Sequence, residues 1–150
     1  MSGEADMLKN FSDTIDAIIN HLKDKSETLG IAAECIEHIV VINSEYQYNG
    51  PVPAILLFLD PVKSEVSQSF SMVLEATFYV LAEQLESGSA AMKDAMSKAA
   101  LLMQVLSQHN QTSFYYMPND DRPIEIVASN SDRAVVAVNG LIPFIAYEVS

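Results

Sequence analysis

Residues Phe70–Ala82 read FSMVLEATFYVLA, and the conformation of this stretch decides the fold. Every second residue from Phe70 to Ala82 is apolar, a period of two that is typical of a β-strand. Its valine, threonine and aromatic side chains also favour a strand. A helix is the alternative, because a helical stripe can be drawn through Val66, Phe70, Val73, Leu74, Phe78, Leu81 and Leu85. We favour one long strand.

Two helices flank this stretch along the chain. Residues 4–24 form an amphipathic pattern with apolar side chains at three- and four-residue steps, and Gly30 marks the loop beyond it. The second helix covers residues 90–108, after an N-cap offered by Ser87-Gly88-Ser89. Methionines recur on the apolar stripe of this helix, where core packing is the plain interpretation.

Two shorter strands precede the long one. Ile36–Ile42 is rich in β-branched residues and too short for an independent helix. Ala54–Leu59 is apolar without interruption, which predicts a strand in the middle of the sheet, stopped by Asp60-Pro61.

The last third of the chain predicts a β ribbon. Ile124–Ala128 and Ala134–Val138 are strand-like, and Asn139-Gly140 predicts a tight hairpin before Leu141–Val149. Pro143 implies an edge position or an irregularity there. The sequence therefore predicts one α+β domain over residues 1–150: an N-terminal helix, strands in a mixed or antiparallel sheet, a second long helix and a C-terminal β ribbon.

Composition excludes several partners. The net charge is −12, and the eight basic residues are scattered, so we expect no nucleic-acid binding and no acidic membrane partner. The N-terminus lacks the basic start and apolar run of a secretory signal, and no apolar stretch has the length of a membrane span. Cys35 is the only cysteine, which favours a reducing compartment. We expect a cytoplasmic protein.

No constellation of residues predicts an enzyme, a cofactor or a metal. Glu34, Cys35, Glu37 and His38 are the only local cluster of metal-ligating types, and a strand would place Glu34 and His38 on one face and the other two on the opposite face. Apolar neighbours make Cys35 a buried thiol rather than a nucleophile. The chain has no Gly-x-Ser-x-Gly elbow and no phosphate-binding loop. Asp120 and Asp121 read as solvated turn residues.

The candidate interaction site is an aromatic group in the linker after the second helix. Phe114, Tyr115, Tyr116 and Met117 are consecutive, and aromatic residues and methionine are enriched at the centres of protein interfaces. The other interpretation is packing over the sheet edge. The apolar ribbon, whose segment Leu141–Val149 carries only Glu148, adds a second reason to expect self-association.

The order of the predicted elements resembles that of the neck and tail-completion proteins of tailed bacteriophages, the tail-terminator and head–tail connector group. The similarity rests on the N-terminal helix, Ala54–Leu59 with the long strand Phe70–Ala82, the helix Ala90–Gln108 and the closing strand after Asn139-Gly140. It implies a structural phage or prophage protein without catalytic residues, located in the bacterial cytoplasm or the virion. It also implies a homo-oligomer, commonly a hexameric ring, that contacts other tail or neck proteins.

A second resemblance is to acidic secretion chaperones of similar size. These proteins also alternate helices with strands, act as dimers and bind segments of effector proteins. They usually close with a helix, whereas this chain has a strand-like Phe144–Val149.

Overall fold

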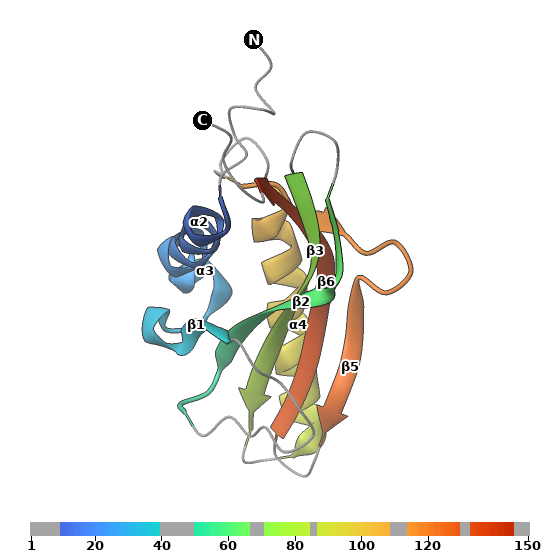
Figure 1. The fold of residues 1–150 in the computed structure, drawn as a ribbon. Helices are drawn as coiled ribbons and strands as arrows, with labels where there is room; N and C mark the ends of the chain where they lie inside the picture. The colour runs from blue at the N-terminus through green and yellow to red at the C-terminus, as the bar shows by residue number, and fades with distance from the viewer. Residues whose placement is uncertain are drawn as a thin grey trace.

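The computed structural model describes residues 10–39, 50–66, 71–84, 87–108, 114–129 and 133–145 (Figure 1). The chain forms an α+β fold, as the sequence predicted. Its elements in order are α2 (Phe11–Asp24), α3 (Ser26–Leu29), the 3-10 helix η1 (Ala33–Cys35), β1 (Ile36–Ile39), β2 (Ala54–Val66), β3 (Ser71–Glu83), α4 (Gly88–Leu106), β4 (Met117–Pro118), β5 (Ile124–Ser129) and β6 (Arg133–Ile145).

The strands form one mixed sheet in the order β1-β2-β3-β6-β4, and β5 also pairs with β6. Only the β1–β2 pair is parallel; the other described pairs are antiparallel. The strand prediction for Phe70–Ala82 is confirmed from Ser71 onward, while Phe70 lies outside the described residues. Because β3 pairs with β2 on one side and β6 on the other, the alternating stretch lies at the centre of the sheet.

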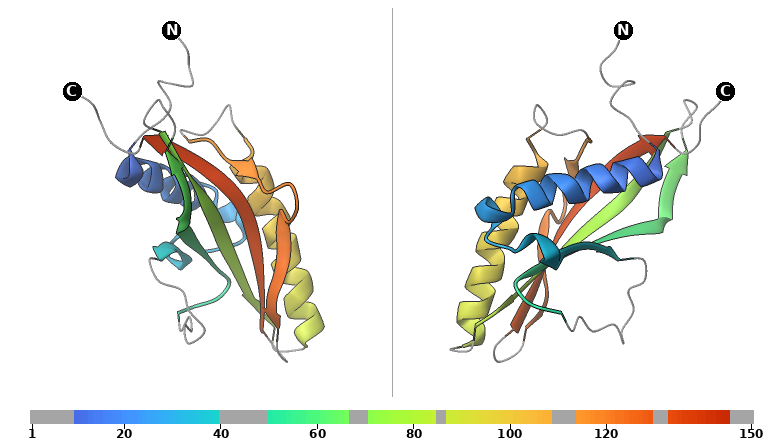
Figure 2. Two further views of the ribbon diagram at one scale, coloured as in Figure 1. Left: turned by 45° about the vertical axis from the view of Figure 1, so that its right-hand side comes forward. Right: turned by 90° about the vertical axis from the view of Figure 1, so that its left-hand side faces the viewer.

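Both long helices pack on one face of this sheet, as Figure 2 shows. The strand register places His38, Leu57, Phe78 and Val138 in one row across that face. The apolar core under the helices draws its fully buried members from the sheet and from both helices: Ile18, Leu22, Ile55, Leu57, Phe78, Val80, Ala95, Ala99, Leu102, Val136 and Val138. Alternation on β3 therefore divides a helix-covered face from an opposite face, on which Glu75 and Thr77 are half-buried. Farther along that face, Leu56, Leu81 and Ala137 are buried.

Side-chain caps fix the start of each long helix. Asn10 Oδ1 accepts a hydrogen bond from the backbone N–H of Asp13 at 2.8 Å, and Ser87 Oγ accepts one from Ala90 at 3.1 Å. Ser87 thus provides the cap predicted within Ser87-Gly88-Ser89, and α4 begins at Gly88, two residues before the predicted start. The part of the predicted first helix before Asn10 lies outside the described residues. Gly30 ends α3 with a φ of 69°, the left-handed conformation that glycine adopts without strain.

The hairpin predicted at Asn139-Gly140 is wrong, because β6 runs unbroken from Arg133 to Ile145. Asn139 pairs with Thr77, and Gly140 pairs with Ala76. A type I′ turn needs positive φ, and Gly30 is the only glycine with positive φ among the described residues. The glycine is needed for another reason: a Cβ at Gly140 would lie 2.4 Å from the ring of Tyr116.

Two strand boundaries also differ from expectation. Asp60-Pro61 does not stop β2, which continues to Val66 after a register irregularity between Asp60 and Glu65. The apolar edge expected at Leu141–Val149 is paired with β3 as far as Ile145, and residues 146–149 lie outside the described part. Pairing with β4 ends at Leu141, so Pro143 has a described partner strand on one side only, consistent with its missing N–H.

Candidate functional site

The structure divides the predicted aromatic interface group between core and surface. Phe114 and Tyr116 are buried, Tyr115 is half-buried, and Met117 is 44% exposed. Phe114 and Tyr116 are therefore core residues, and the interface interpretation does not hold for these two. Tyr115 and Met117 stay candidates for contact with another molecule.

Tyr116 is buried because it fills the space above a glycine. Its ring lies over Gly140 and meets Phe78 edge-on with ring centroids 6.0 Å apart. The Tyr116 hydroxyl is buried and has no hydrogen-bond partner among the residues that the structure describes. Burial raises the pKa of this phenol well above its usual range.

Phe114 packs against α2, and His21 of α2 in turn contacts α4. Its ring meets His21 of α2 edge-on at 5.8 Å, and His21 Nε2 lies 3.3 Å from the carbonyl oxygen of Val105 on α4. The linker after α4 is thus tied to the core before it reaches β4. This anchoring positions Met117 at the sheet margin.

We define the β4–β5 margin by the exposed side chains of Met117, Ile126 and Val127. β4 pairs with Leu141 and Gly140 of β6, and β5 pairs with β6 farther along the same side, from Val138 to Ala134. Ile126 is 60% exposed and Val127 is 48% exposed. Among the side chains whose exposure the structure describes, Phe11 and Met96 are the two other exposed large apolar ones. Exposed apolar side chains thus concentrate along one margin of the sheet.

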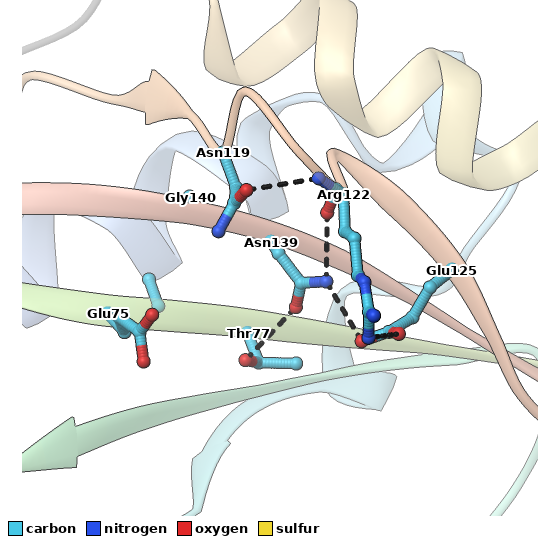
Figure 3. Close-up of a pocket in the computed structure, with 8 residues that line it drawn as sticks. Glu75, Thr77, Asn119, Arg122, Glu125, Asn139 and Gly140 are labelled. Carbon is cyan, nitrogen blue, oxygen red and sulfur yellow. Dashed lines mark hydrogen bonds and ion pairs between the residues drawn. The ribbon is translucent and has the colours of Figure 1, made fainter.

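A polar pocket of about 220 Å³ lies beside this margin, on the sheet face opposite the helices (Figure 3). Strands β3 and β6 form its floor and the turn between β4 and β5 forms its wall. The residues that line it are Glu75, Ala76, Thr77, Asn119, Arg122, Glu125, Asn139 and Gly140.

Asn139 is the centre of the hydrogen bonds in this pocket. Its Oδ1 accepts from Thr77 Oγ1 at 3.3 Å, and its Nδ2 donates to the carbonyl oxygen of Arg122 at 3.0 Å and to Glu125 Oε1 at 3.1 Å. Its backbone N–H donates to Pro123 O at 2.9 Å, and its carbonyl accepts from Asn119 N at 3.0 Å. Asn139 therefore holds the turn between β4 and β5 against β6.

Asn119 shapes the turn itself. Its Oδ1 accepts hydrogen bonds from the backbone N–H groups of Asp121 at 2.9 Å and Arg122 at 3.0 Å, the pattern of an Asx-turn. Arg122 Nη1 lies 3.7 Å from Glu125 Oε2, and both side chains are open to solvent. The polar groups of the pocket thus bond largely to one another, an arrangement that fixes the turn.

The cluster around Cys35 takes a different form from the one expected. Cys35 ends η1 instead of lying on a strand, and it is buried. Burial raises the pKa of its thiol, and the carboxylates of Glu34 and Glu37 raise it further. Burial lowers the pKa of His38. Within the described ranges, no group of three or more His, Cys, Asp or Glu side chains is placed to hold a metal ion.

Sequence reasoning missed the role of Asn139 and the position of the margin. The sequence predicts Asp120 and Asp121 as turn residues, but Asn139, the residue that holds this turn, lies in a different strand. The Asn139-Gly140 pair predicts a hairpin turn, whereas in the structure it lies within the unbroken strand β6. No local pattern distinguishes a hairpin asparagine from one that bonds across a sheet.

No protein-family model matches this chain, and no curated protein is significantly similar to it. No helix in the described part is long and apolar enough to cross a membrane. A functional assignment therefore depends on the geometry of this chain.

Proposed function

We propose that this chain is a structural protein of a tailed bacteriophage or prophage that caps or joins the tail. It acts by assembling with copies of itself and by contacting other tail or neck proteins, without catalysing a reaction. Two features of its element order support the resemblance to tail-terminator and connector proteins: a central long strand and a second long helix. The separate closing strand expected after Asn139-Gly140 does not support it, because β6 is unbroken.

The observation that carries this proposal is the exposed apolar β4–β5 margin. Edge strands of soluble proteins are usually blunted by charges or covered by another element. Here Ile126 and Val127 stand exposed on a strand whose only ionisable residue is Glu125, and Met117 extends the apolar surface along β4. Such a surface favours contact with another protein molecule.

The polar pocket supports the same conclusion. Five hydrogen bonds hold the turn before β5 in place. Asn119 Oδ1 accepts from the backbone N–H groups of Asp121 and Arg122. Asn139 Nδ2 donates to Arg122 O and Glu125 Oε1, and Asn139 O accepts from Asn119 N. A fixed turn pre-organises the margin, and pre-organisation lowers the entropic cost of association.

Sedimentation velocity over a range of micromolar concentrations tests the proposal. We expect an oligomer larger than a dimer, and we expect Met117→Lys to shift it toward monomer by placing a charge in the contact. Met96→Lys is the matched control, because Met96 is similarly exposed, at 38%, but lies on α4.

Other outcomes discriminate the alternatives. A discrete dimer that Met117→Lys leaves intact would favour the acidic secretion chaperone. A chain that stays monomeric at every concentration, and also in the presence of tail tubes from the phage that encodes it, would contradict the proposal.

A further inference from the structure

We infer that the outer edge of β5 docks an extended segment of a partner protein that alternates apolar residues with lysine or arginine. The inference rests on the proposed function, because it names the kind of partner that one part of the β4–β5 margin receives. The proposed docking site is β5 with the turn before it. Self-association through Met117 on β4 is independent of this site.

The backbone of β5 supplies the first reason. β5 pairs with β6 and with no other strand in the described chain, and Figure 1 shows it at the border of the sheet. In an antiparallel pair the N–H and C=O groups of alternate residues point away from the partner strand. An extended segment can therefore continue the sheet by hydrogen-bonding to β5.

The exposed side chains supply the second reason. Ile126 and Val127 are the two central residues of the six-residue strand Ile124–Ser129. A register irregularity lies between Ile126 and Ala128, and such bulges bend an edge and limit flat pairing with a long partner strand. A short extended segment with apolar side chains suits this edge better than a long flat one.

Charge identifies the partner. Residues 114–129 contain three carboxylates, on Asp120, Asp121 and Glu125, against the single guanidinium of Arg122. Asp120 and Asp121 are exposed in the turn that leads into β5. The guanidinium of Arg122 lies beside Glu125 at 3.7 Å, so the two aspartates dominate the outer surface of the turn. Lysine or arginine in the arriving segment would meet opposite charge.

The same charges argue against a second copy in this position. A second β5 carries Glu125 and no lysine or arginine, so it offers no opposite charge to Asp120 and Asp121. Ionic strength separates the two cases. Binding of a basic segment weakens as salt screens the attraction, whereas self-pairing of two acidic copies strengthens as salt screens the repulsion.

The probe is a fluorescently labelled synthetic peptide that alternates valine with lysine, and binding to the full chain is followed by fluorescence anisotropy. We expect saturable binding that weakens with salt, and slower amide exchange on β5 than in the peptide-free chain. The double variant Ile126→Asp with Val127→Asp should weaken binding about tenfold. Circular dichroism checks that the variants fold.

That double variant distinguishes docking from nonspecific attraction. It adds two negative charges, so binding driven by charge alone would become tighter, and this result would overturn the inference. Two charge-removal variants give a second comparison: Asp120→Asn with Asp121→Asn, and Asp13→Asn with Asp16→Asn on the exposed side of α2. We expect the first pair to weaken binding severalfold more than the second; equal effects would overturn the inference.

The measurements also separate this inference from the proposed function. If the chain binds the probe at β5 but sediments as a monomer, docking at β5 is supported and self-assembly is contradicted. A chain that forms oligomers but binds no probe, or that associates through β5 more strongly as salt rises, would overturn the inference and leave the proposed function standing.

Discussion

The ring of Tyr116 occupies the space that a side chain at position 140 would need, so only glycine fits there. A Cβ at residue 140 would lie 2.4 Å from Cε1 and Cζ of the tyrosine ring and 2.5 Å from its hydroxyl oxygen. Tyr116 is fully buried and also packs against Phe78, so the ring cannot move without displacing its neighbours. The close contact between a strand glycine and a linker tyrosine joins the linker after α4 to the centre of the sheet.

Gly140→Ala should destabilise the fold. We expect a loss of about 1–3 kcal/mol in the free energy of unfolding, because an added methyl group in a packed core forces its neighbours apart. Urea denaturation measures it. Gly140→Ala combined with Tyr116→Leu should cost less than the sum of the two single changes. Additive costs would show that the two residues are not coupled.

Tyr116 should contribute through its ring and not through its hydroxyl. Tyr116→Phe should leave the free energy of unfolding unchanged or raise it by about 1 kcal/mol, because it removes a buried hydroxyl that has no partner among the described residues. Tyr116→Ala should cost about 3–5 kcal/mol, the usual loss for a buried aromatic ring. Tyr115→Ala, at a half-buried position, is the control. A large loss in Tyr116→Phe would reveal a hydrogen bond to the hydroxyl.

Stability should fall in alkaline solution because of Tyr116. Burial raises the folded-state pKa of this phenol, so above the unfolded pKa of about 10 the unfolded chain releases a proton that the folded chain keeps. This contribution to stability is constant below that pH and declines as pH rises above it. Denaturation curves across this range should show a shallower decline for Tyr116→Phe. If the stability of the native sequence and of Tyr116→Phe fell equally with pH, the loss would come from other titrating groups.

Asn139→Ala should loosen the turn before β5. The change removes hydrogen bonds to Thr77, to the carbonyl of Arg122 and to Glu125, and we expect a loss of about 1–3 kcal/mol. Hydrogen exchange should speed up at the amides of Asp121 and Arg122 more than along α2. Asn20→Ala is the matched control, because Asn20 is exposed on α2. Unchanged exchange in the turn would contradict the role given to Asn139.

Cys35 should be unreactive in the folded protein. Its side chain is buried, and burial and two neighbouring carboxylates raise the pKa of its thiol, so little thiolate is present at neutral pH. A thiol reagent should therefore modify Cys35 at the rate of unfolding, and urea should accelerate the reaction. Rapid modification of the folded chain would show that the site opens without unfolding.

Local sequence patterns predicted the elements whose signals lie within one turn or one strand. Ser87 could be recognised as a cap because its hydroxyl bonds to an amide three residues away. The alternation in β3 could be read because the side-chain period of a strand is a local property. In both cases the atoms that determine the structure are close together in the sequence.

The mistaken predictions concern residues whose partners are remote. Asn139-Gly140 predicts a hairpin by its local sequence, but Asn139 bonds to Thr77 and Gly140 packs under Tyr116. For Phe114 and Tyr116 the sequence left core packing and an interface both open, and contacts with His21, Phe78 and Gly140 decide for packing. The free energy that decides each case comes from contacts across more than twenty residues of chain.

The sequence by itself determined the α+β class, the order of helices and strands, and the strand character of Ser71–Ala82, because periodicity and capping depend on neighbouring residues. Only the tertiary structure decided that β6 is unbroken, that β5 lies at the border of the sheet, and that Asn139 holds the turn beside it. An edge strand is one that pairs on one side only, and which strands pair depends on the arrangement of the whole sheet. For that reason the exposed apolar margin lies at β5, whereas the sequence pattern pointed to Leu141–Val149.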